Sequence, residues 1–405
     1  MKICIMSEPC PVTYMSGLTA RMRLLVEHLI DESKDTVEII CAEAVQPNPP
    51  VSMSSPKNNT APINYTYGIP FPGYALLTLP LDWTFKVWRT VRRMRPDLIH
   101  CTSPGMLVFP ALFCARVLQI PIVMSYHTHI PVYIRTYLPR CVRHLAEWVA
   151  WRIIHATHSM SDLTLVTSTQ ILEEFQKRGI PRCELWLKGV DTEQFSPKHY
   201  SEEMRIRMSG GNPKDFLLVY VGRIAIEKRL HDLRDILKRI PSCRLCIVGK
   251  GPYESEVRKS LVDTPTVFTG ELWGTELSQA FASGDCFVMP SDSETLGFVV
   301  LESMASGVPV VAAHAGGIPD IVQDSENGFL VPTGDIAAYT NRIKLLQNDL
   351  ELRKKMSATA RESVASLGWR TSMQKLRMGS YIRAKDKFDD RWERGLIRIF
   401  RPNLQ

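Results

Sequence analysis

Two carboxylates that lie eight positions apart, Glu294 and Glu302, flank a predicted strand-to-helix junction. The run Cys286–Met289 is typical of a strand, and the apolar run Phe298–Ser306 is typical of a helix. Glu294 then lies at a loop tip and Gly297 near a helix start, where open N–H groups and the dipole attract phosphate. Carboxylates in turn accept hydrogen bonds from sugar hydroxyls. The layout suits a nucleotide sugar, although the spacing alone is more typical of a helix cap and a solvated helix face.

A glycine followed by two cations supplies a second fragment. Gly222 ends a predicted strand and permits close approach of the backbone to a ligand. Arg223 and Lys228 combine a planar hydrogen-bonding fork with a point charge, which is the pair that a diphosphate requires. Gly249 ends the next predicted strand in a tight turn that could pack on a base or a ribose. Each fragment alone also fits surface cations or an ordinary turn.

The first half of the chain offers a histidine pair and a glycine at predicted loop positions. His127 and His129 follow a predicted strand, but no cysteine or carboxylate accompanies them, so a metal site is not favoured. We expect His127 to face a cleft and to donate to a developing oxyanion or a sugar hydroxyl; a buried, hydrogen-bonded histidine is the alternative. Gly17 begins a predicted helix whose N–H groups could meet a phosphate, although the dinucleotide-binding fingerprint is missing.

The chain is long enough for two domains. Its 405 residues exceed one compact core, and short apolar runs alternate with helix-like segments in both halves. This alternation predicts an α/β fold of two doubly wound parallel sheets, with ligands beyond the carboxyl ends of the strands. We place an N-terminal domain at residues 1–195 and a second domain at 196–374, near a polar segment with helix breakers. A helix over about 375–405 is expected to pack back on the first domain.

Composition narrows the class of protein. Ten dispersed cysteines predict a reducing compartment and buried thiols, not a zinc site. We expect no signal peptide, because the first residues run directly into a strand pattern, and the longest apolar run is too short to cross a bilayer. The net charge is +7, and Lys and Arg are concentrated in residues 86–152 and 370–401. Such faces suit anionic lipid, nucleic acid or a charged substrate, and equally an ordinary solvated surface.

The joint order of these fragments resembles a known family. A glycine-containing N-terminal loop, His-Thr, Gly-Arg-x4-Lys, Glu-x7-Glu and Ala-Gly-Gly follow one another as in the retaining, family-four glycosyltransferases. The resemblance implies the GT-B fold, in which two Rossmann-like domains face each other across a cleft. Five strings are similar, more narrowly, to plant and algal sulfoquinovosyltransferases: residues 103–105, 123–134, 188–191, 203–207 and 276–280.

The resemblance assigns roles to the motif residues. Arg223 and Lys228 would hold the donor diphosphate, and Glu294 would bind the hydroxyls of the donor sugar. Glu302 would bind the ribose, and His127 would orient the donor sugar. The implied catalytic group is therefore His127, Glu294, Arg223 and Lys228. The implied donor-binding residues are Gly17, Gly222, Arg223, Lys228, Gly249, Leu296, Gly297 and Glu302.

The same resemblance implies a reaction and its partners. Sulfoquinovose would pass from UDP-sulfoquinovose to diacylglycerol in a membrane, without a metal or other cofactor, because cations and helix dipoles neutralise the leaving UDP. Lys188 and Arg135 are the candidate partners of the sulfonate. No nucleic-acid partner is implied. The expected location is a plastid membrane surface with anionic lipid, although a transit segment is absent from this chain; the alternative is a cytoplasmic, membrane-associated protein.

Two stretches combine aromatic and basic residues in a way that suits a lipid monolayer. They run from Val132 to Arg152 and from Trp83 to Arg93, and in both the aromatic residues fit a core equally well. Three other functions fit parts of the sequence. They are a glucosyl- or mannosyltransferase that uses a UDP- or GDP-sugar, a UDP-sugar epimerase, and a non-enzymatic protein that binds a lipid surface or nucleic acid.

Overall fold

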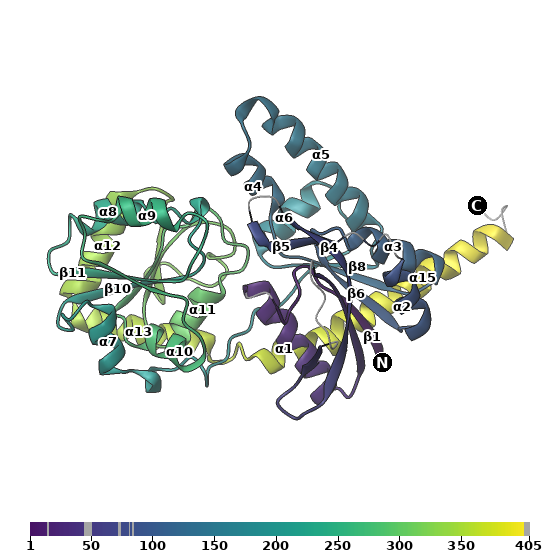
Figure 1. The fold of residues 1–405 in the computed structure, drawn as a ribbon, viewed down its shortest axis with the longest axis horizontal. Helices are drawn as coiled ribbons and strands as arrows, with labels where there is room; N and C mark the ends of the chain where they lie inside the picture. Colours follow the sequence, from purple (N-terminus) through teal and green to yellow (C-terminus); the bar gives the residue numbers. More distant parts are fainter. Residues whose placement is uncertain (14–15, 44–50, 72–73, 81, 83–84, 401–405) are drawn as a thin grey trace. The chain divides into compact units, whose positions relative to one another are not determined.

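The structure, a computed structural model, divides into two compact units, each built around a β-sheet (Figure 1). Unit 1 comprises Met1–Leu187 and Arg370–Gln405, and unit 2 comprises Lys188–Trp369. The α/β fold class with two parallel-sheet domains is confirmed. The structure describes residues 1–13, 16–43, 51–71, 74–80, 82 and 85–400.

The chain passes from one unit to the other at residues that differ from the predicted domain boundaries. Unit 2 begins at Lys188 rather than after residue 195, because Val190 forms a parallel bridge with a residue of unit 2. The chain returns to unit 1 after Trp369 rather than after residue 374. That the first domain faces the lipid acceptor and that the second binds the nucleotide sugar, as the resemblance implies, stay predictions.

Unit 1 contains a mostly parallel sheet. In the described residues its strands lie in the order β3-β4-β2-β1-β6-β7-β8-β9, with β5 beside β4. β3 and β5 run antiparallel to β4, whereas the other neighbours run parallel, so the antiparallel pairs lie at one edge. The strands are β1 Lys2–Met6, β2 Thr36–Glu43, β3 Ser52–Ser54, β4 Thr60–Phe71, β5 Tyr74–Pro80, β6 Leu98–Ser103, β7 Ile122–Tyr126, β8 Leu163–Val166 and β9 Cys183–Leu185.

The C-terminal helical segment packs on unit 1. Its Arg377 bonds to the buried carboxylate of Asp35, with Nη2 2.9 Å from Oδ1, and the hydroxyl of Tyr381 lies 2.7 Å from His100 Nδ1. Among the described residues, no helix is both long and apolar enough to span a bilayer. The helices of this unit are α1 Gly17–Asp31, α2 Lys86–Met94, α3 Val108–Val117, α4 Ile130–Tyr137, α5 Arg140–Ser159 and α6 Thr169–Lys177, followed near the C-terminus by α14 Trp369–Lys375, the π-helical turn Leu376–Ser380 and α15 Tyr381–Phe400.

Unit 2 contains a parallel sheet covered on both faces. Its described strands lie in the order β12-β11-β10-β13-β14-β15, and every neighbouring pair is parallel. Successive side chains of β10 enter two different apolar clusters, as expected for a strand buried on both faces. The strands are β10 Phe216–Val221, β11 Cys243–Val248, β12 Thr266–Gly270, β13 Cys286–Met289, β14 Val310–Ala313 and β15 Gly328–Val331. The helices are α7 Glu202–Met208, α8 Asp232–Leu237, α9 Glu254–Ser260, α10 Gly274–Ala282, α11 Phe298–Ala305, α12 Ile336–Asn348 and α13 Leu350–Ala365, with short 3₁₀ turns at Pro197–His199 and Ile226–Lys228.

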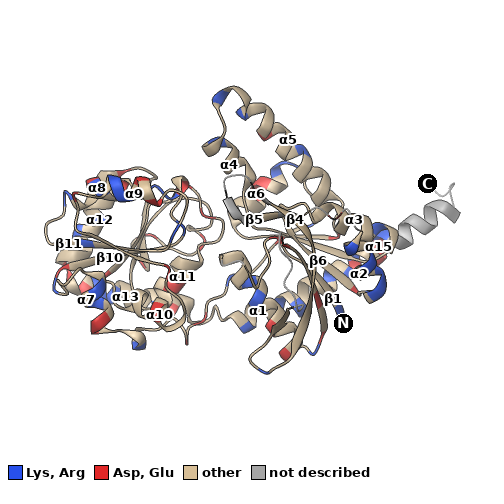
Figure 2. Cartoon of the chain, viewed as in Figure 1, with Lys and Arg blue, Asp and Glu red and all other residues tan. Residues whose placement is uncertain are grey.

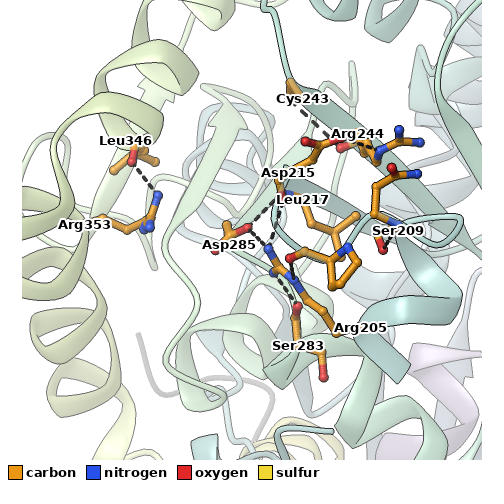
Figure 3. A network of polar contacts seen from close by, with 12 residues as sticks. Arg205, Ser209, Asp215, Leu217, Cys243, Arg244, Ser283, Asp285, Leu346 and Arg353 are labelled. Carbon is orange, nitrogen blue, oxygen red and sulfur yellow. Dashed lines mark hydrogen bonds and ion pairs between the residues drawn. The ribbon is translucent and has the colours of Figure 1, made fainter. Parts of the chain in front are cut away.

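A polar network fastens the amino ends of these strands (Figure 3). Arg205 of α7 lies 2.6 Å from Asp285 and donates to the carbonyl of Ser283 at 2.8 Å. Asp285 also accepts the N–H of Leu217 at 2.8 Å, which joins β10 to the residue that precedes β13. Arg244 of β11 pairs with Asp215 at 2.6 Å. These residues stabilise the amino edge of the sheet. The loops that are expected to bind a ligand lie at the opposite, carboxyl edge.

Candidate functional site

The strand order of unit 2 reverses between β10 and β13, and the loops after these strands meet. In open parallel sheets, ligands bind beyond the carboxyl ends of the strands at such a reversal. Lys228, after β10, places its Nζ 2.9 Å from Oε2 of Glu294, after β13. Their side chains are 15% and 16% exposed, so the pair is shielded but open to a ligand. The fold thus joins two predicted site residues that are 66 positions apart.

Glu294 is held as a carboxylate. Burial opposes its ionisation, but Lys228 and the N–H groups of Gly297 and Leu296 outweigh burial, and the pKa of Glu294 lies below its usual value. The N–H of Gly297 donates to Glu294 Oε1 at 3.2 Å. In this structure the backbone at Leu296 and Gly297, which we assigned to the sugar and phosphate, therefore serves the carboxylate. Glu294 is an anionic acceptor at neutral pH, as recognition of hydroxyls requires.

The paired glycines after β14, Gly316 and Gly317, pack against the backbone of Glu294. Gly316 has φ +60°, and a Cβ atom there would come 1.9 Å from the carbonyl oxygen of Glu294. The N–H of Gly317 donates to that same oxygen at 2.7 Å. Lys188, a buried residue, donates from Nζ to the carbonyl of Gly317 at 2.9 Å and lies 3.2 Å from Asp320. Lys188 is therefore linked to Glu294 through one residue of the glycine loop.

Arg223 has a carboxylate partner that the sequence analysis missed. Its Nη2 lies 2.5 Å from Oε1 of Glu227, which is almost fully buried. The spacing of four residues was the available signal, since side chains so placed are neighbours on a helical turn. Glu227 thus holds the guanidinium of Arg223, and Glu227 and Lys228 lie on the same 3₁₀ turn, Ile226–Lys228.

The glycines at the ends of β10 and β11 pack against each other. A Cβ atom at Gly249, which has φ +137°, would lie 2.0 Å from the carbonyl oxygen of Gly222. The N–H of Gly222 donates to the carbonyl of Val248 at 3.0 Å. Close backbone contact thus explains Gly249 without a ligand, and its predicted contact with a base or a ribose stays a prediction.

Glu302 lies in the helix that begins after Gly297. It is half-buried, and burial raises the pKa of its carboxyl to about 7. A carboxyl in this state changes charge within the physiological pH range. Its protonation therefore affects any ligand that bonds to it.

His127 lies in unit 1 and is buried, as in the alternative of a buried, hydrogen-bonded histidine, and its place beside a cleft stays a prediction. Its Nε2 lies 2.9 Å from the hydroxyl of Ser125, which also lies 2.9 Å from Nε2 of His100. Burial, with smaller effects of Arg21 and His100, holds the pKa of His127 well below its usual value. The ring is therefore neutral and hydrogen-bonded, and its part in orienting a sugar stays a prediction.

A buried arginine lies one turn beyond Gly17 in α1. Gly17 is exposed at the helix start, after a capping box formed by Ser16 and Thr19. Arg21 is fully buried, stacks 3.8 Å above the ring of Trp186 and donates to its carbonyl at 3.1 Å. Arg21 was not singled out from the sequence, because arginine is rarely buried without partners and its partner here, Trp186, lies far away in the sequence. Its four-residue spacing from Gly17 was the only local signal.

Arg135 is occupied by a carboxylate of its own unit. Its Nε donates to Oε2 of Glu147 at 3.0 Å, and Nη2 bonds to the other oxygen. A bidentate pair of this kind fixes the planar guanidinium. The structure thus gives Arg135 a partner other than a sulfonate, whereas Lys188 lies beside the loop of Glu294.

Glu8 is a third residue that was not singled out from the sequence. It follows β1, and its carboxylate accepts the N–H groups of Met106, at 2.9 Å, and Leu107 at the start of α3. Burial raises the pKa of Glu8 to about 7 against the effect of these two N–H groups. Its position directly after a predicted strand was the available signal.

Known proteins share both the sequence and the fold of this chain. The family model for "Glycosyl transferases group 1" matches residues 202–363, and that for "Glycosyltransferase Family 4" matches residues 15–194. The sulfoquinovosyl transferase SQD2 of Arabidopsis thaliana is 40% identical over 95% of this chain and 74% of its own length. A GDP-mannose-dependent alpha-mannosyltransferase of Mycobacterium tuberculosis is 36% identical over 72% of the chain and 75% of its own length.

Solved structures agree on the fold. Sucrose-phosphate synthase of Thermosynechococcus elongatus has a TM-score of 0.75 at 21% identity and covers 94% of this chain and 98% of its own. Anabaena Alr3699/HepE in complex with UDP and glucose has a TM-score of 0.71 at 18% identity and covers 93% of this chain and 98% of its own. The chain belongs to the family-four glycosyltransferases of the GT-B fold.

Proposed function

We propose that this glycosyltransferase moves sulfoquinovose from UDP-sulfoquinovose to diacylglycerol. The 40% identity to a sulfoquinovosyl transferase over nearly the whole chain carries the proposal. The second candidate is a mannosyltransferase, which the 36% identity to a GDP-mannose-dependent enzyme supports. Membership of the family argues against an epimerase or a non-enzymatic protein.

The proposed donor site uses the Lys228–Glu294 pair as a preformed contact. When a nucleoside diphosphate sugar binds, Lys228 and Arg223 face the diphosphate, and Glu294 accepts hydroxyls of the sugar. The cations stabilise the charge that develops on the leaving UDP, so the proposal needs no metal and no other cofactor. Retention of the anomeric configuration would follow from front-face attack by the acceptor hydroxyl.

The direct test is the identity of the product. The purified chain is incubated with diacylglycerol vesicles and, separately, UDP-sulfoquinovose, UDP-glucose and GDP-mannose, and the lipid is analysed by mass spectrometry. We expect the sulfoquinovosyl lipid as the main product. A main product from GDP-mannose would support the second candidate instead, and hydrolysis of every donor without glycolipid would contradict a diacylglycerol acceptor.

Binding of UDP is expected to tighten as the pH rises from about 6 to about 8. The ribose hydroxyls would donate to ionised Glu302, and the pKa of that carboxyl is about 7 before binding. Titration calorimetry of the parent and of Glu302→Gln measures the effect, and the variant should show a flatter dependence. The same pH dependence in both proteins would remove Glu302 from the ribose contact.

The effect of pH on folding stability has the opposite sign to its effect on UDP binding, because deprotonation of Glu302 favours the ligand but lowers the free energy of unfolding. The Glu302 carboxyl has a reference pKa of 4.5 and a folded pKa of about 7, so the folded state binds more protons between these values. Its contribution to the free energy of unfolding is present below about pH 4.5 and is lost as the pH rises to about 7. Because Glu8 behaves alike, the informative quantity is the difference between the parent and Glu302→Gln.

Lys188→Ala is expected to lower kcat/KM for UDP-sulfoquinovose about tenfold more than kcat/KM for UDP-glucose. Lys188 is a buried cation beside the loop that supports Glu294, and a sulfonate would gain from it where a neutral hydroxymethyl would not. Steady-state kinetics with both donors, with thermal unfolding as a control for the fold, measures the difference. Equal losses on the two donors would assign Lys188 to support of the glycine loop alone.

We propose that the helices α4 and α5, whose place in unit 1 Figure 1 shows, meet the membrane. On α5, Leu145 and Trp148 are 66% and 62% exposed, with the exposed cations Arg140 and Arg152 on the same helix. Trp151 instead belongs to the core of unit 1. One apolar face with flanking cations is the arrangement of an interfacial helix. In the second predicted stretch, Trp83 lies outside the described residues.

The variant Leu145→Asp/Trp148→Asp is expected to lower binding to anionic vesicles by at least about tenfold. Two carboxylates would replace the apolar anchors and would oppose the negative surface potential. Flotation with phosphatidylglycerol vesicles at low and high salt measures the effect. Val262→Asp, which changes an exposed apolar residue of unit 2, is the matched control. Unchanged flotation of the double variant would contradict this docking surface.

A further inference from the structure

An apolar hollow lies between the first turns of α2 and α3 in unit 1. Its volume is about 420 Å3, within the range of roughly 300–1,000 Å3 that is typical of small-molecule pockets. Apart from one carboxylate, the wall residues that the structure describes carry aromatic, aliphatic, proline and cysteine side chains. The apolar wall residues are Pro80, Phe85, Trp88, Met106, Leu107, Phe109, Pro110, Phe113 and Cys114.

Asp82, the charged residue among the described wall residues, is already hydrogen-bonded within the protein. Asp82 accepts the N–H groups of Lys86 at 2.8 Å and Val87 at 3.0 Å, which cap the start of α2, and the hydroxyl of Thr66 at 3.2 Å. Its charge is thereby placed at the positive end of the helix dipole. The hollow therefore suits an occupant without polar groups, such as a hydrocarbon chain.

Aromatic rings at the rim of the hollow are exposed to solvent. Phe85, Phe109 and Phe113 are all exposed, and the Phe113 ring lies 5.5 Å from that of Trp88. Phe85 also adopts φ +51°, a left-handed conformation that is unfavourable for an aromatic residue. Contiguous exposed apolar groups of this kind mark a binding surface.

The hollow borders the carboxyl edge of the sheet in unit 1. The N–H groups of two wall residues, Met106 and Leu107, bond to Glu8, which follows β1. A Cβ atom at Gly105 would lie 2.6 Å from the Glu8 carboxylate, so a larger residue there would displace that carboxylate from its present position. Ligands of open α/β sheets bind at this edge. A hydrocarbon chain in the hollow would thus leave the polar end of its lipid near the carboxyl edge, where ligands of such sheets bind.

Charges on α2 indicate a lipid rather than a second copy of the chain. Arg89 and Arg92 follow Phe85 and Trp88 by four residues each, so they lie on the same side of the helix as these wall residues. Figure 2 shows the Lys and Arg gathered on α2. A symmetric dimer through this face would bring the two sets of arginines together, which is unfavourable. Anionic headgroups around an acyl chain would instead complement them.

We infer that the hollow between α2 and α3 binds one acyl chain of the diacylglycerol acceptor. The inference rests on the proposed function for the identity of the lipid, whereas the site itself is defined by the residues of unit 1. The acyl chain enters between the exposed phenylalanines, and the glycerol hydroxyl stays outside the apolar walls near the carboxyl edge.

Paired variants on α3 test the inference by kinetics. Phe113, a wall residue, and Val117, one turn further on, are 55% and 53% exposed, so aspartate at either position should be tolerated equally. We expect Phe113→Asp to raise the KM for long-chain diacylglycerol about ten- to a hundredfold. Val117→Asp should leave it unchanged, and the KM for the nucleotide sugar should stay constant in both. Equal effects of the two variants on the lipid KM would overturn the inference.

Photolabelling gives a second readout that does not need turnover. Diacylglycerol with a diazirine near the end of one acyl chain is irradiated with the full-length protein, and labelled peptides are mapped by mass spectrometry. We expect label on residues 85–88 and 106–114, and its loss in Phe113→Asp. Label confined to α4 and α5, or a dimer that Phe113→Asp dissociates in sedimentation, would overturn the acyl-chain site. If the label maps as expected but no glycolipid forms, only the proposed function fails.

Discussion

Replacing Glu294 by alanine is expected to lower kcat by about two orders of magnitude while leaving the fold intact. Loss of hydrogen bonds to a charged group is worth about 1.5–3 kcal/mol each, and the carboxylate is proposed to hold the reacting sugar. Its partners in the unliganded structure are Lys228 and the N–H groups of Leu296 and Gly297. The side chain of Lys228 can turn to water, because the pair is partly exposed, whereas the two backbone N–H groups lose a partner at a cost of about 1–3 kcal/mol, so the protein should be less stable but should still unfold cooperatively.

Two further variants make the Glu294 result interpretable. Glu294→Gln keeps the shape but removes the charge, and it should retain more stability than activity. Glu276→Ala removes an exposed carboxylate of α10 that pairs with Arg207, and it should leave kcat unchanged. Single-turnover kinetics and titration of UDP separate the chemical step from donor binding. Full activity of Glu294→Ala would show that the donor sugar is held elsewhere.

Gly316→Ala is expected to disable the same site through the backbone. The new Cβ atom would meet the carbonyl oxygen of Glu294 at 1.9 Å, and neither partner can rotate away, because both are main chain. We expect a loss of stability of about 1–3 kcal/mol from overpacking and a fall in activity to a few per cent or less. Thermal unfolding and kcat/KM for the donor measure the two effects.

The control for this variant shares its backbone conformation but not its crowding. Gly274 has φ +52°, and a Cβ atom there meets nothing within 4 Å. Gly274→Ala therefore carries the cost of a left-handed alanine, about 1–2 kcal/mol, without the clash. Activity of Gly316→Ala equal to that of Gly274→Ala would show that the glycine loop yields and that the position of Glu294 tolerates the shift.

Much of the fold followed from local patterns in the sequence. The run Leu217–Val221 lies within a parallel strand, and the residues after Cys286–Met289 form a loop and then a helix, as the apolar spacing indicated. Parallel strands bring their carboxyl ends to one edge, so the sequence alone placed Lys228 and Glu294 in loops at that edge, whereas the order of the strands, known only from the structure, made these loops neighbours. The antiparallel strands beside β4 were not anticipated, because their residues carry no clear apolar period.

The sequence by itself determined the family, the α/β class and the set of loops that form the site, because these depend on short-range periodicity and on motifs that persist along the chain. Only the tertiary structure decided which partner each charged group takes. Lys228 meets Glu294, Arg135 meets Glu147, and His127 is buried against Ser125. Such choices depend on packing between segments far apart in sequence, where distance and burial set the strength of each interaction.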